Sequence, residues 1–550
     1  MSIYYPSIFA SINTVDDEDM ITNLLNIDSI NFKSIFFPGT NIQYYRPVLY
    51  LTFIFDRFVW LCDESFMHLE NVIVHTINGI LVFFVSREIL KKILFKPETV
   101  SFFIALFFLL HPLNTEPVNW ISGRTDLLAG MFVLLSIYFL LTNISKGYIW
   151  IWFSAIIYFL GLLSKESALS LLVVIMVLIL INEEKIGFKF KGRKIKILIP
   201  YVIFTGLYFL IRNLVAHVDK GLSSVTNPTN GNFLINIGSI IKAIGFYVKK
   251  LFLPVPLNFC IVDINRTFYF WFGLLIILIC LFLIKRRRLL DILFLNSVIF
   301  FLPATVLPLA KMTWTPLAER YLYLSTFTFS FFIVLLIKKI SIKNNLSNIV
   351  IIVLLVISCI ITAQRNIVWQ NNYTLFKDTV KKSPNFAPAR NEYGIALAKM
   401  GRKEEAIEQF KYAQFLSKGN HILSKLNIIE EKYFNDKDYN KIISEYNRIL
   451  KEKNSPEVNI KVLKRIIQIL EYVSANEKNK DKSIRLYIEL LNYYKALTDY
   501  EKSDKYLYRL GQLYLSLGYK ENAKNVFYEL IKLHPKSQYS LYSSKLLKKI

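Results

Sequence analysis

Cysteine is scarce in this chain, and its four cysteines follow no functional pattern. Cys62, Cys260, Cys280 and Cys359 show neither the paired spacing of a metal site nor the dense framework of a disulfide-rich domain. Cys280 and Cys359 lie inside apolar runs, where a free thiol packs as a small hydrophobic side chain. The sequence therefore argues against a fold built on disulfides or structural zinc.

Acidic side chains are also in short supply: the chain has 41 Asp and Glu but 66 Lys and Arg, which gives a net charge of +25. The basic residues lie in short segments between apolar runs and along a polar C-terminal tail. A nucleic-acid-binding protein instead gathers them in one stripe with interleaved aromatics. We therefore expect no nucleic acid partner and assign the counter-charge to membrane lipid headgroups and lipid phosphates.

Apolar residues are abundant, with 54% of the chain hydrophobic and 15% aromatic. Runs close to the roughly 20 residues that cross a bilayer recur up to residue 363 and then stop. We predict spans near 66–86, 99–111, 126–142, 148–164, 167–182, 195–212, 267–284, 290–309, 320–337 and 347–363. The predicted fold class is all-α, with an N-terminal segment over 1–65, a multi-span domain over 66–363 and a polar helical domain over 364–550.

The charge of the connecting segments predicts which side of the membrane each one faces. Alternate loops are basic, and the positive-inside rule makes them cytoplasmic: 87–96, 143–147, 185–196, 285–288 and 338–343. The other loops, the acidic cluster before the first span and everything after residue 363 are then external. We expect an integral, multi-pass membrane protein whose C-terminal domain lies on the non-cytoplasmic side.

The external segments carry polar residues that a simple anchor does not need. In the stretch 111–126, Glu116 and Arg124 stand at i and i+8, so on one helix they would share a face. Glu is also paired with a cation in Lys165–Glu166 and in Glu319–Arg320. A plain reversing loop is the alternative, but the confinement of these pairs to one side favours an external, polar-lined cavity.

The N-terminal segment holds an acidic cluster at residues 16–19 and an aromatic run from Tyr44 to Trp60. Asp56 and Arg57 interrupt that run, so we predict an amphipathic helix lying on the membrane surface. The chain carries no basic signal-peptide region before the acidic cluster.

After residue 363, polar helices with small residues at fixed positions predict tetratricopeptide repeats of roughly 34 residues. One repeat is indicated by Gly394, Leu397, Gly401, Ala406, Phe410 and Ala413, and a second by Gly511, Tyr514, Gly518, Ala523 and Phe527. In such repeats Gly and Ala let two helices approach, and Phe fills the groove between them. The stretch 420–503 is degenerate, and no heptad pattern supports a coiled coil.

An ordered set of short motifs resembles a known family. The motifs are Asp16-Asp17, Tyr45-Arg46-Pro47, His68 with Asn71 and His75, His111-Pro112, Thr115-Glu116-Pro117-Val118, Arg124-Thr125-Asp126, Ser164-Lys165-Glu166 and Glu319-Arg320-Tyr321-Leu322-Tyr323. With the repeats behind them, they resemble the transmembrane and tetratricopeptide-repeat O-mannosyltransferases (TMTC-like) and their bacterial relatives over nearly the whole chain.

The resemblance implies a GT-C glycosyltransferase that takes a sugar, mannose, from a polyprenyl-phosphate carrier. Such enzymes act on the external or lumenal side, which implies the bacterial cytoplasmic membrane, or the ER membrane in a eukaryote. The acceptor is a hydroxyl of a protein or glycan, and the repeats are expected to bind the acceptor or a protein partner. The family has a full span before its acidic pair, so we expect a first span to be missing or truncated here.

Sugar transfer from a lipid phosphate needs a base for the acceptor hydroxyl and cations for the departing phosphate. We assign the base to Asp16 or Asp17, with Asp17 preferred, and give Glu116 the role of orienting acceptor or base. The candidate phosphate ligands are Arg124, Lys165, Arg212 and Arg320, with an interfacial anchor as the alternative for each. The supporting residues are Arg46, His75, His111, Glu166, Glu319 and Tyr323.

No cofactor is firmly expected, because the lipid-linked sugar is a substrate. Asp17-Glu18-Asp19 has the DxD spacing that holds a divalent metal in some glycosyltransferases, but we do not expect a bound metal here. The alternative function is a catalytically inactive, membrane-anchored scaffold whose repeats bind other proteins.

The charge pattern makes a direct prediction about topology. A cysteine placed at Ser417 should react with a membrane-impermeant thiol reagent on intact cells, and a cysteine at Ser341 should react only after permeabilisation. The reverse pattern would move the acidic cluster to the cytoplasm and contradict the assigned orientation.

Overall fold

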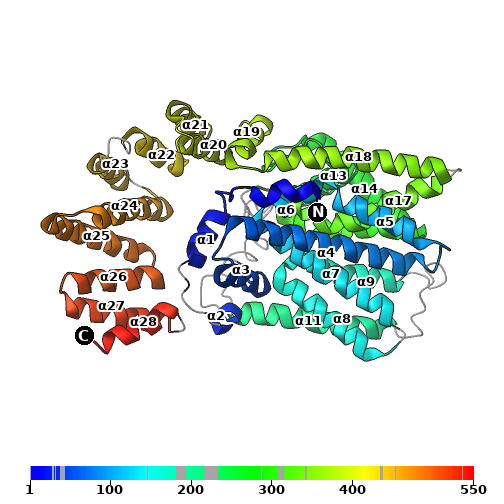
Figure 1. Ribbon diagram of the computed structural model, residues 1–550, viewed down its shortest axis with the longest axis horizontal. Helices are drawn as coiled ribbons and strands as arrows, with labels where there is room; N and C mark the ends of the chain where they lie inside the picture. Colours follow the sequence, from blue (N-terminus) through cyan, green and yellow to red (C-terminus); the bar gives the residue numbers. More distant parts are fainter. Residues whose placement is uncertain are drawn as a thin grey trace. The chain divides into compact units, whose positions relative to one another are not determined.

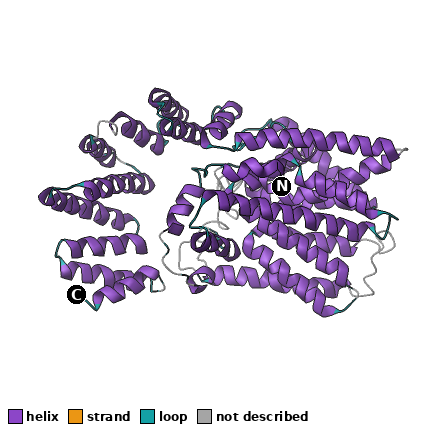
Figure 2. Ribbon diagram, in the orientation of Figure 1, coloured by secondary structure: helices purple, strands orange, loops and turns teal. Residues whose placement is uncertain are grey.

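The chain is helical almost throughout the part that the structure describes (Figure 2). The computed structural model describes residues 2–25, 27, 30, 32–37, 44–144, 146–180, 194–215, 233–286, 288–307, 315–340, 344–433, 438–452, 454–535 and 537–550. Within these ranges the β-type pairing consists of a single bridge between Ile261 and Leu317. The predicted all-α fold class is confirmed.

Contacts divide the chain into two units, one reaching to Pro384 and one from Asn385 to Ile550. The composition changes near residue 364, within α18 (Asn344–Val368). That helix and the following α19 (Asn372–Lys382) both belong to the first unit. The compact boundary therefore comes later in the chain than the predicted boundary at residue 364.

Each of the ten predicted spans coincides with a helix of the first unit. In order they are α4 (Glu64–Leu90), α5 (Pro97–Leu109), α7 (Arg124–Asn143), α8 (Tyr148–Ser164), α9 (Ser170–Leu180), α11 (Lys194–Val215), α14 (Arg266–Arg286), α15 (Leu289–Phe301), α17 (Tyr323–Ile340) and α18. Among the described residues, seven helical segments are long and apolar enough to cross a membrane, and α5 with the bent segment after it makes an eighth. Helices α8 and α9 are shorter, and α4 packs against both α5 and α7 (Figure 1).

The stretch 111–126 is broken into short turns, so the predicted shared helix face of Glu116 and Arg124 is wrong. It forms η2 (Pro112–Asn114), α6 (Thr115–Asn119) and η3 (Ile121–Gly123) before α7 begins at Arg124. Trp120 leaves the helical conformation with φ −91° and ψ 122°. Gly123 then lies so close to the backbone of Pro117 that a Cβ there would stand 2.6 Å from its carbonyl oxygen. This close approach turns Glu116 and Arg124 toward different surroundings.

A long helix, α13 (Phe233–Phe252), lies in the connection between the predicted spans 195–212 and 267–284. It packs tightly against α14 through two glycines. A Cβ on Gly245 would lie 2.4 Å from the carbonyl oxygen of Tyr269, and one on Gly273 would lie 2.0 Å from that of Ile241. The two backbones touch, and α13 is thereby fixed to the helical domain.

The first residues of the chain form η1 (Ser2–Phe9), which packs against α4 and α18. Three side-chain amides at and just after the end of α18 donate hydrogen bonds to the backbone of η1 and of the residues that follow η1. They are Asn366 Nδ2 to Ile3 O (2.8 Å), Gln370 Nε2 to Pro6 O (2.9 Å) and Asn372 Nδ2 to Ile12 O (2.7 Å). We call this set the amide clamp, and it fixes the segment that leads to Asp16.

Three short helices follow: α1 (Asp17–Leu25), α2 (Phe32–Phe36) and α3 (Pro47–Val59). Helix α3 corresponds to the amphipathic helix predicted between Tyr44 and Trp60, and it begins at a proline, as many helices do. Asp56, however, is fully buried inside the protein. One of the two charged residues that suggested an amphipathic helix therefore faces the protein interior, where Arg124 pairs with it.

The second unit stacks helices in sequence order (Figure 1). They are α20 (Ala387–Lys399), α21 (Lys403–Leu416), α22 (Ile422–Tyr433), α23 (Tyr439–Lys451), α24 (Pro456–Asn476), α25 (Lys480–Tyr500), α26 (Asp504–Ser516), α27 (Lys520–Leu533) and α28 (Gln538–Leu547). Both predicted repeats have the expected internal packing, because Gly394 lies against the ring of Phe410 and Gly511 against that of Phe527. The tetratricopeptide character predicted from these positions is confirmed.

The close contact at Gly511 predicts a stability effect. A Cβ there would lie 2.3 Å from the Phe527 ring, so Gly511→Val should overpack the pair and cost about 1–3 kcal/mol of unfolding free energy. Thermal unfolding of residues 385–550, followed by circular dichroism, measures the loss. Ser516→Val is the matched control, because it adds the same side chain at an exposed position of α26. Equal melting temperatures for the two variants would contradict the proposed packing role.

Candidate active site

Three cations come together from segments that are far apart in the sequence. Arg46 precedes α3, Lys165 lies between α8 and η4 (Glu166–Leu169), and Arg320 lies in η6 (Glu319–Leu322). Each is held by a carboxylate: Arg46 by Glu166 at 2.9 Å, Lys165 by Asp126 at 2.6 Å and Arg320 by Glu116 at 2.5 Å. We call these six residues the three ion pairs.

The exposure of the partners shows how two of these pairs are oriented. The side chain of Lys165 is 10% exposed against 5% for Asp126, and that of Arg320 is 14% exposed against 2% for Glu116. The carboxylates therefore anchor the two cations from the protein interior. Arg46 is 20% exposed and its partner Glu166 is 28% exposed, so this pair lies nearer to solvent.

Tyr321 lies between two of the cations. Its ring centroid is 5.3 Å from Lys165 Nζ and 4.8 Å from Arg320 Cζ, which is cation–π distance in both cases. Arg320 also donates a hydrogen bond to the Tyr321 hydroxyl at 3.3 Å and stacks over the Trp120 ring at 4.8 Å. The aromatic rings thus hold Arg320 and Lys165 a short distance apart.

Electrostatics show that the cations act on one another. Burial lowers the pKa of Lys165, its partner Asp126 opposes that change, and the charges of Arg46 and Arg320 lower the pKa further. Like charges this close repel, and a bound anion would relieve the repulsion. The arrangement is suited to a phosphate group.

The two aspartates of the acidic pair have different surroundings. Asp17 is buried, and its carboxylate accepts two hydrogen bonds, one from the Ser122 hydroxyl at 2.5 Å and one from the Ser122 backbone N–H at 3.0 Å. Burial raises the pKa of Asp17 to about 7 despite these bonds. Asp16 is exposed, but the surrounding protein raises its pKa above the usual value, and the charge of Arg320 opposes that rise without cancelling it. Asp16 is therefore the accessible carboxylate beside the cations, and Asp17 ties the start of α1 to η3.

Glu116 is occupied by three hydrogen bonds. Its Oε2 accepts from the backbone N–H groups of Glu319 (3.1 Å) and Arg320 (3.2 Å), and its Oε1 accepts from the Arg320 guanidinium. With 1% of its surface exposed, Glu116 positions Arg320. These contacts favour that role over contact with an acceptor.

Arg124, predicted as a phosphate ligand, lies elsewhere. It is 1% exposed and pairs with Asp56 at 2.7 Å and with Glu70 at 2.9 Å. It also donates to the Asn71 side chain at 2.9 Å and to the Met67 carbonyl at 2.9 Å. Its guanidinium is thus committed to holding α7 against α3 and α4.

The remaining predicted residues separate into two groups. Arg212, on α11, is close enough to Glu166 for their charges to attract, which places it on the Arg46 side of the ion pairs. His75 and Tyr323 hydrogen-bond to each other at 2.8 Å inside the helical core, and His111 caps η2 by accepting from the Leu113 N–H at 3.4 Å. The structure brings none of these three into contact with the cations.

The sequence did not predict two residues that contact the cations. Asp126 was given no role although it lies in the Arg124-Thr125-Asp126 motif, and Tyr321 was given none although Tyr323 in the same motif was. The signal for Tyr321 was its place directly after Arg320, where the turn of η6 keeps both side chains near each other. For the described residues, no group of three or more His, Cys, Asp or Glu is arranged to hold a metal ion.

Comparison with known proteins confirms the resemblance that the motifs predicted. The chain is 23% identical over 597 aligned residues to human protein O-mannosyl-transferase TMTC3, covering 96% of this chain and 63% of the relative. It is 24% identical over 420 residues to protein O-mannosyl-transferase F38B6.6 of Caenorhabditis elegans, covering 72% and 58%. Human protein O-mannosyl-transferase TMTC1 matches at 33% identity over 98 residues, which is 18% of this chain and 11% of the relative.

The matches leave part of each relative uncovered, because the chain spans less than two thirds of the length of all three. No family model matches the chain. Among solved structures, the tetratricopeptide protein YrrB shares 14% identity over 31% of this chain and 97% of its own, with a TM-score of 0.15. That score is too low to indicate a common fold.

The burial of Arg124 predicts a structural defect when it is removed. Arg124→Ala would leave Asp56 and Glu70 without their cation, and breaking such a buried pair costs about 3–5 kcal/mol. The thermal stability of the detergent-solubilised protein should fall accordingly. Arg87→Ala is the control, since Arg87 and its partner Glu98 are 42% and 55% exposed and such a pair contributes about 0–1 kcal/mol. A fully stable Arg124→Ala protein would refute the anchoring role.

Proposed function

We propose that this protein is a membrane glycosyltransferase of GT-C type that moves mannose from polyprenyl phosphate to a hydroxyl of a protein or glycan acceptor. The reaction would take place on the non-cytoplasmic side. The observation that carries the proposal is the gathering of Lys165 and Arg320 around Tyr321, with Arg46 close enough for its charge to act on Lys165 and with the exposed carboxylate of Asp16 near Arg320. The names of the relatives, protein O-mannosyl-transferases, support the reaction class.

The cations have a clear part in such a reaction. As the bond between the sugar's anomeric carbon and the phosphate oxygen breaks, negative charge grows on the phosphate. Arg320 offers a planar fork that matches two phosphate oxygens, and Lys165 adds a point charge beside it. Because both are held in place before the reaction, little reorganisation is needed when the charge develops.

Asp16 is the base in this proposal. The acceptor hydroxyl oxygen forms the new bond to the anomeric carbon, its proton passes to Asp16, and the lipid phosphate leaves with the bonding electron pair. Asp17 supports this arrangement indirectly, since its hydrogen bonds with Ser122 hold the first turn of α1 in place. The assignment thus moves the base from Asp17, which the sequence favoured, to its neighbour.

The helical repeats are proposed to bind the acceptor protein or a partner. Exposed aromatic side chains on this unit, among them Phe415 and Tyr528, are suited to contact another protein. The active unit and the repeats would then have separate tasks, chemistry for the first and selection of the acceptor for the second.

Asp16→Asn keeps the size of the side chain and removes its proton-accepting charge, so it should lower the turnover number by about 10²–10⁴-fold. Binding of the donor should change little. Transfer of labelled mannose from polyprenyl-phosphate mannose, in membranes that contain equal amounts of each variant, provides the measurement. Glu18→Gln is the control. Glu18 lies two residues after Asp16 at an exposed position of α1, and this variant should transfer mannose at the wild-type rate.

Two outcomes would count against the proposal. A wild-type rate for both Asp16→Asn and Asp17→Asn would remove the acidic pair from the chemistry. Failure of the wild-type protein to transfer mannose to any acceptor, while its repeats still bind a partner, would favour the inactive scaffold instead.

A further inference from the structure

Four buried charged side chains form a continuous chain from the site to the loop that follows α13. Lys250 Nζ lies 2.6 Å from Glu319 Oε1, and Arg320 Nη1 lies 2.5 Å from Glu116 Oε1. The two ion pairs are connected because Glu116 accepts hydrogen bonds from the backbone N–H groups of Glu319 and Arg320. We call these four residues the charge chain, and its order is cation, anion, anion, cation.

The charge chain is neutral because each of its two buried ion pairs is neutral. The side chains of Lys250 and Glu319 are 4% and 1% exposed, and those of Arg320 and Glu116 are 14% and 2% exposed. At such burial each carboxylate needs a cation, because an unpaired buried charge is strongly unfavourable. Arg320, at the more exposed end, is the member that a ligand can reach.

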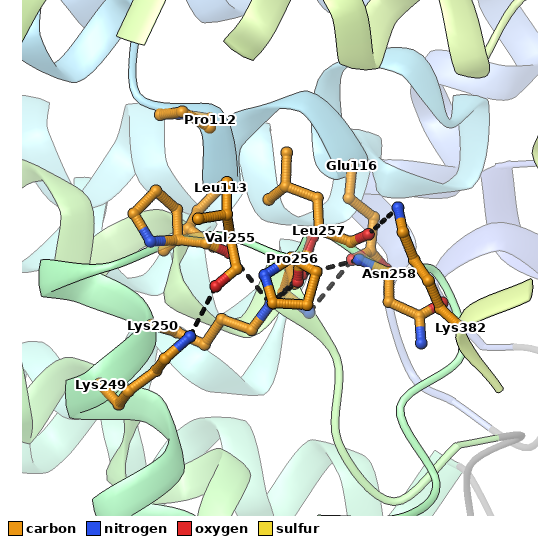
Figure 3. A network of polar contacts seen from close by, with 12 residues as sticks. Pro112, Leu113, Glu116, Lys249, Lys250, Val255, Pro256, Leu257, Asn258 and Lys382 are labelled. Atoms are coloured by element: carbon orange, nitrogen blue, oxygen red, sulfur yellow. Dashed lines mark hydrogen bonds and ion pairs between the residues drawn. The ribbon is translucent and has the colours of Figure 1, made fainter. Parts of the chain in front are cut away.

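Lys250 has further partners in the loop beyond α13 (Figure 3). Its ammonium donates to the carbonyl of Pro254 at 3.0 Å and to that of Pro256, while Lys249 donates to the Val255 carbonyl at 2.6 Å. At the far end of the same loop, Asn258 N–H donates to Glu319 Oε1 at 3.0 Å. The three donors of Lys250 are therefore all used inside the protein, and it is not itself a ligand for substrate.

We propose that Lys250 is a positioning residue for Arg320. Lys250 neutralises Glu319 and thereby leaves the Arg320 guanidinium available to a lipid-linked phosphate. This inference rests on the proposed function, in which Arg320 holds the donor phosphate. Without the Lys250 charge, Glu319 loses the cation that pairs with it, because Lys249 and Lys382 reach it only through longer-range charge attraction. The negative charge of Glu319, next to Arg320 in the chain, then opposes the approach of a phosphate. With Lys250 in place, one carboxylate belongs to each cation.

The guanidinium has the capacity for this additional contact. It carries five N–H donors, and the contacts with Glu116 and the Tyr321 hydroxyl involve one donor from each of its two terminal nitrogens. Glu116 holds it from the interior side, so a phosphate on the exposed side binds without displacing that anchor. The donor affinity then depends on the net charge behind Arg320, which Lys250 sets.

A set of charge variants tests this dependence in the full-length protein. Lys250→Met leaves an extra negative charge behind Arg320 and should weaken binding of polyprenyl phosphate about tenfold, as expected for one charge at moderate dielectric constant. Glu319→Gln removes a negative charge while keeping an oxygen for the Asn258 N–H, and it should tighten binding. The double variant restores neutrality and should bind close to wild type. Both the dissociation constant of polyprenyl phosphate and the KM for polyprenyl-phosphate mannose are measured.

Lys249→Met is the matched control. It removes a neighbouring lysine that also holds a loop carbonyl, makes no ion pair with a glutamate in the described residues and feels Glu319 only through charge attraction at longer range, so donor affinity should fall much less than in Lys250→Met. A double variant as weak as Lys250→Met, or an equal loss in Lys249→Met, would show that the loop and not the charge matters, and would overturn the inference. If Lys250→Met does not fold, Glu319→Gln and the double variant still decide it, because weaker binding in Glu319→Gln contradicts the charge argument.

The proposed function fails in a different way. If Arg320→Ala binds polyprenyl phosphate as tightly as the wild type, Arg320 is not a phosphate ligand, and both the donor site and the role of Lys250 are refuted. If Arg320→Ala loses binding while the charge variants do not follow the predicted order, the donor site stands and only the inference about Lys250 fails.

Discussion

A charge surrounded by apolar helices must have a counter-charge in contact with it, and this constraint shapes the first unit. The cations of the candidate site meet it through carboxylates from other segments, so each ion pair also joins two distant parts of the chain. Lys165 brings the start of α7 to the end of α8 through Asp126, and Arg320 brings α6 to η6 through Glu116. The same contacts that satisfy the buried charges thus assemble the site.

Most carboxylates of the motifs are consequently used for support. Glu116 and Asp126 accept hydrogen bonds from cations, and Asp17 accepts them from Ser122. Asp16 differs, because it is exposed and Arg320 acts on it only through its charge. A short motif in this protein can therefore hold neighbouring residues with opposite tasks, one that fixes the backbone and one that faces the substrate.

The sequence predicted what depends on composition and periodicity. Apolar runs located ten helices of the first unit, and small residues at regular positions located the repeats, since each pattern reflects local packing. It did not predict that Trp120 would break the helix or that Arg124 would turn inward, because both depend on contacts with segments elsewhere in the chain. Lys250 was missed for the same reason, as its role exists only once η6 lies beside the end of α13.

The amide clamp links opposite ends of the first unit. Asn366, Gln370 and Asn372 hold a backbone segment that was synthesised some 360 residues before them. During translation, all the cations and both aspartates are therefore present well before the clamp that places the acidic pair exists. The clamp forms only once α18 and the start of α19 have been made. A nascent chain that stops short of Asn366 therefore contains the acidic pair and the cations but none of the three amides that hold the segment before Asp16.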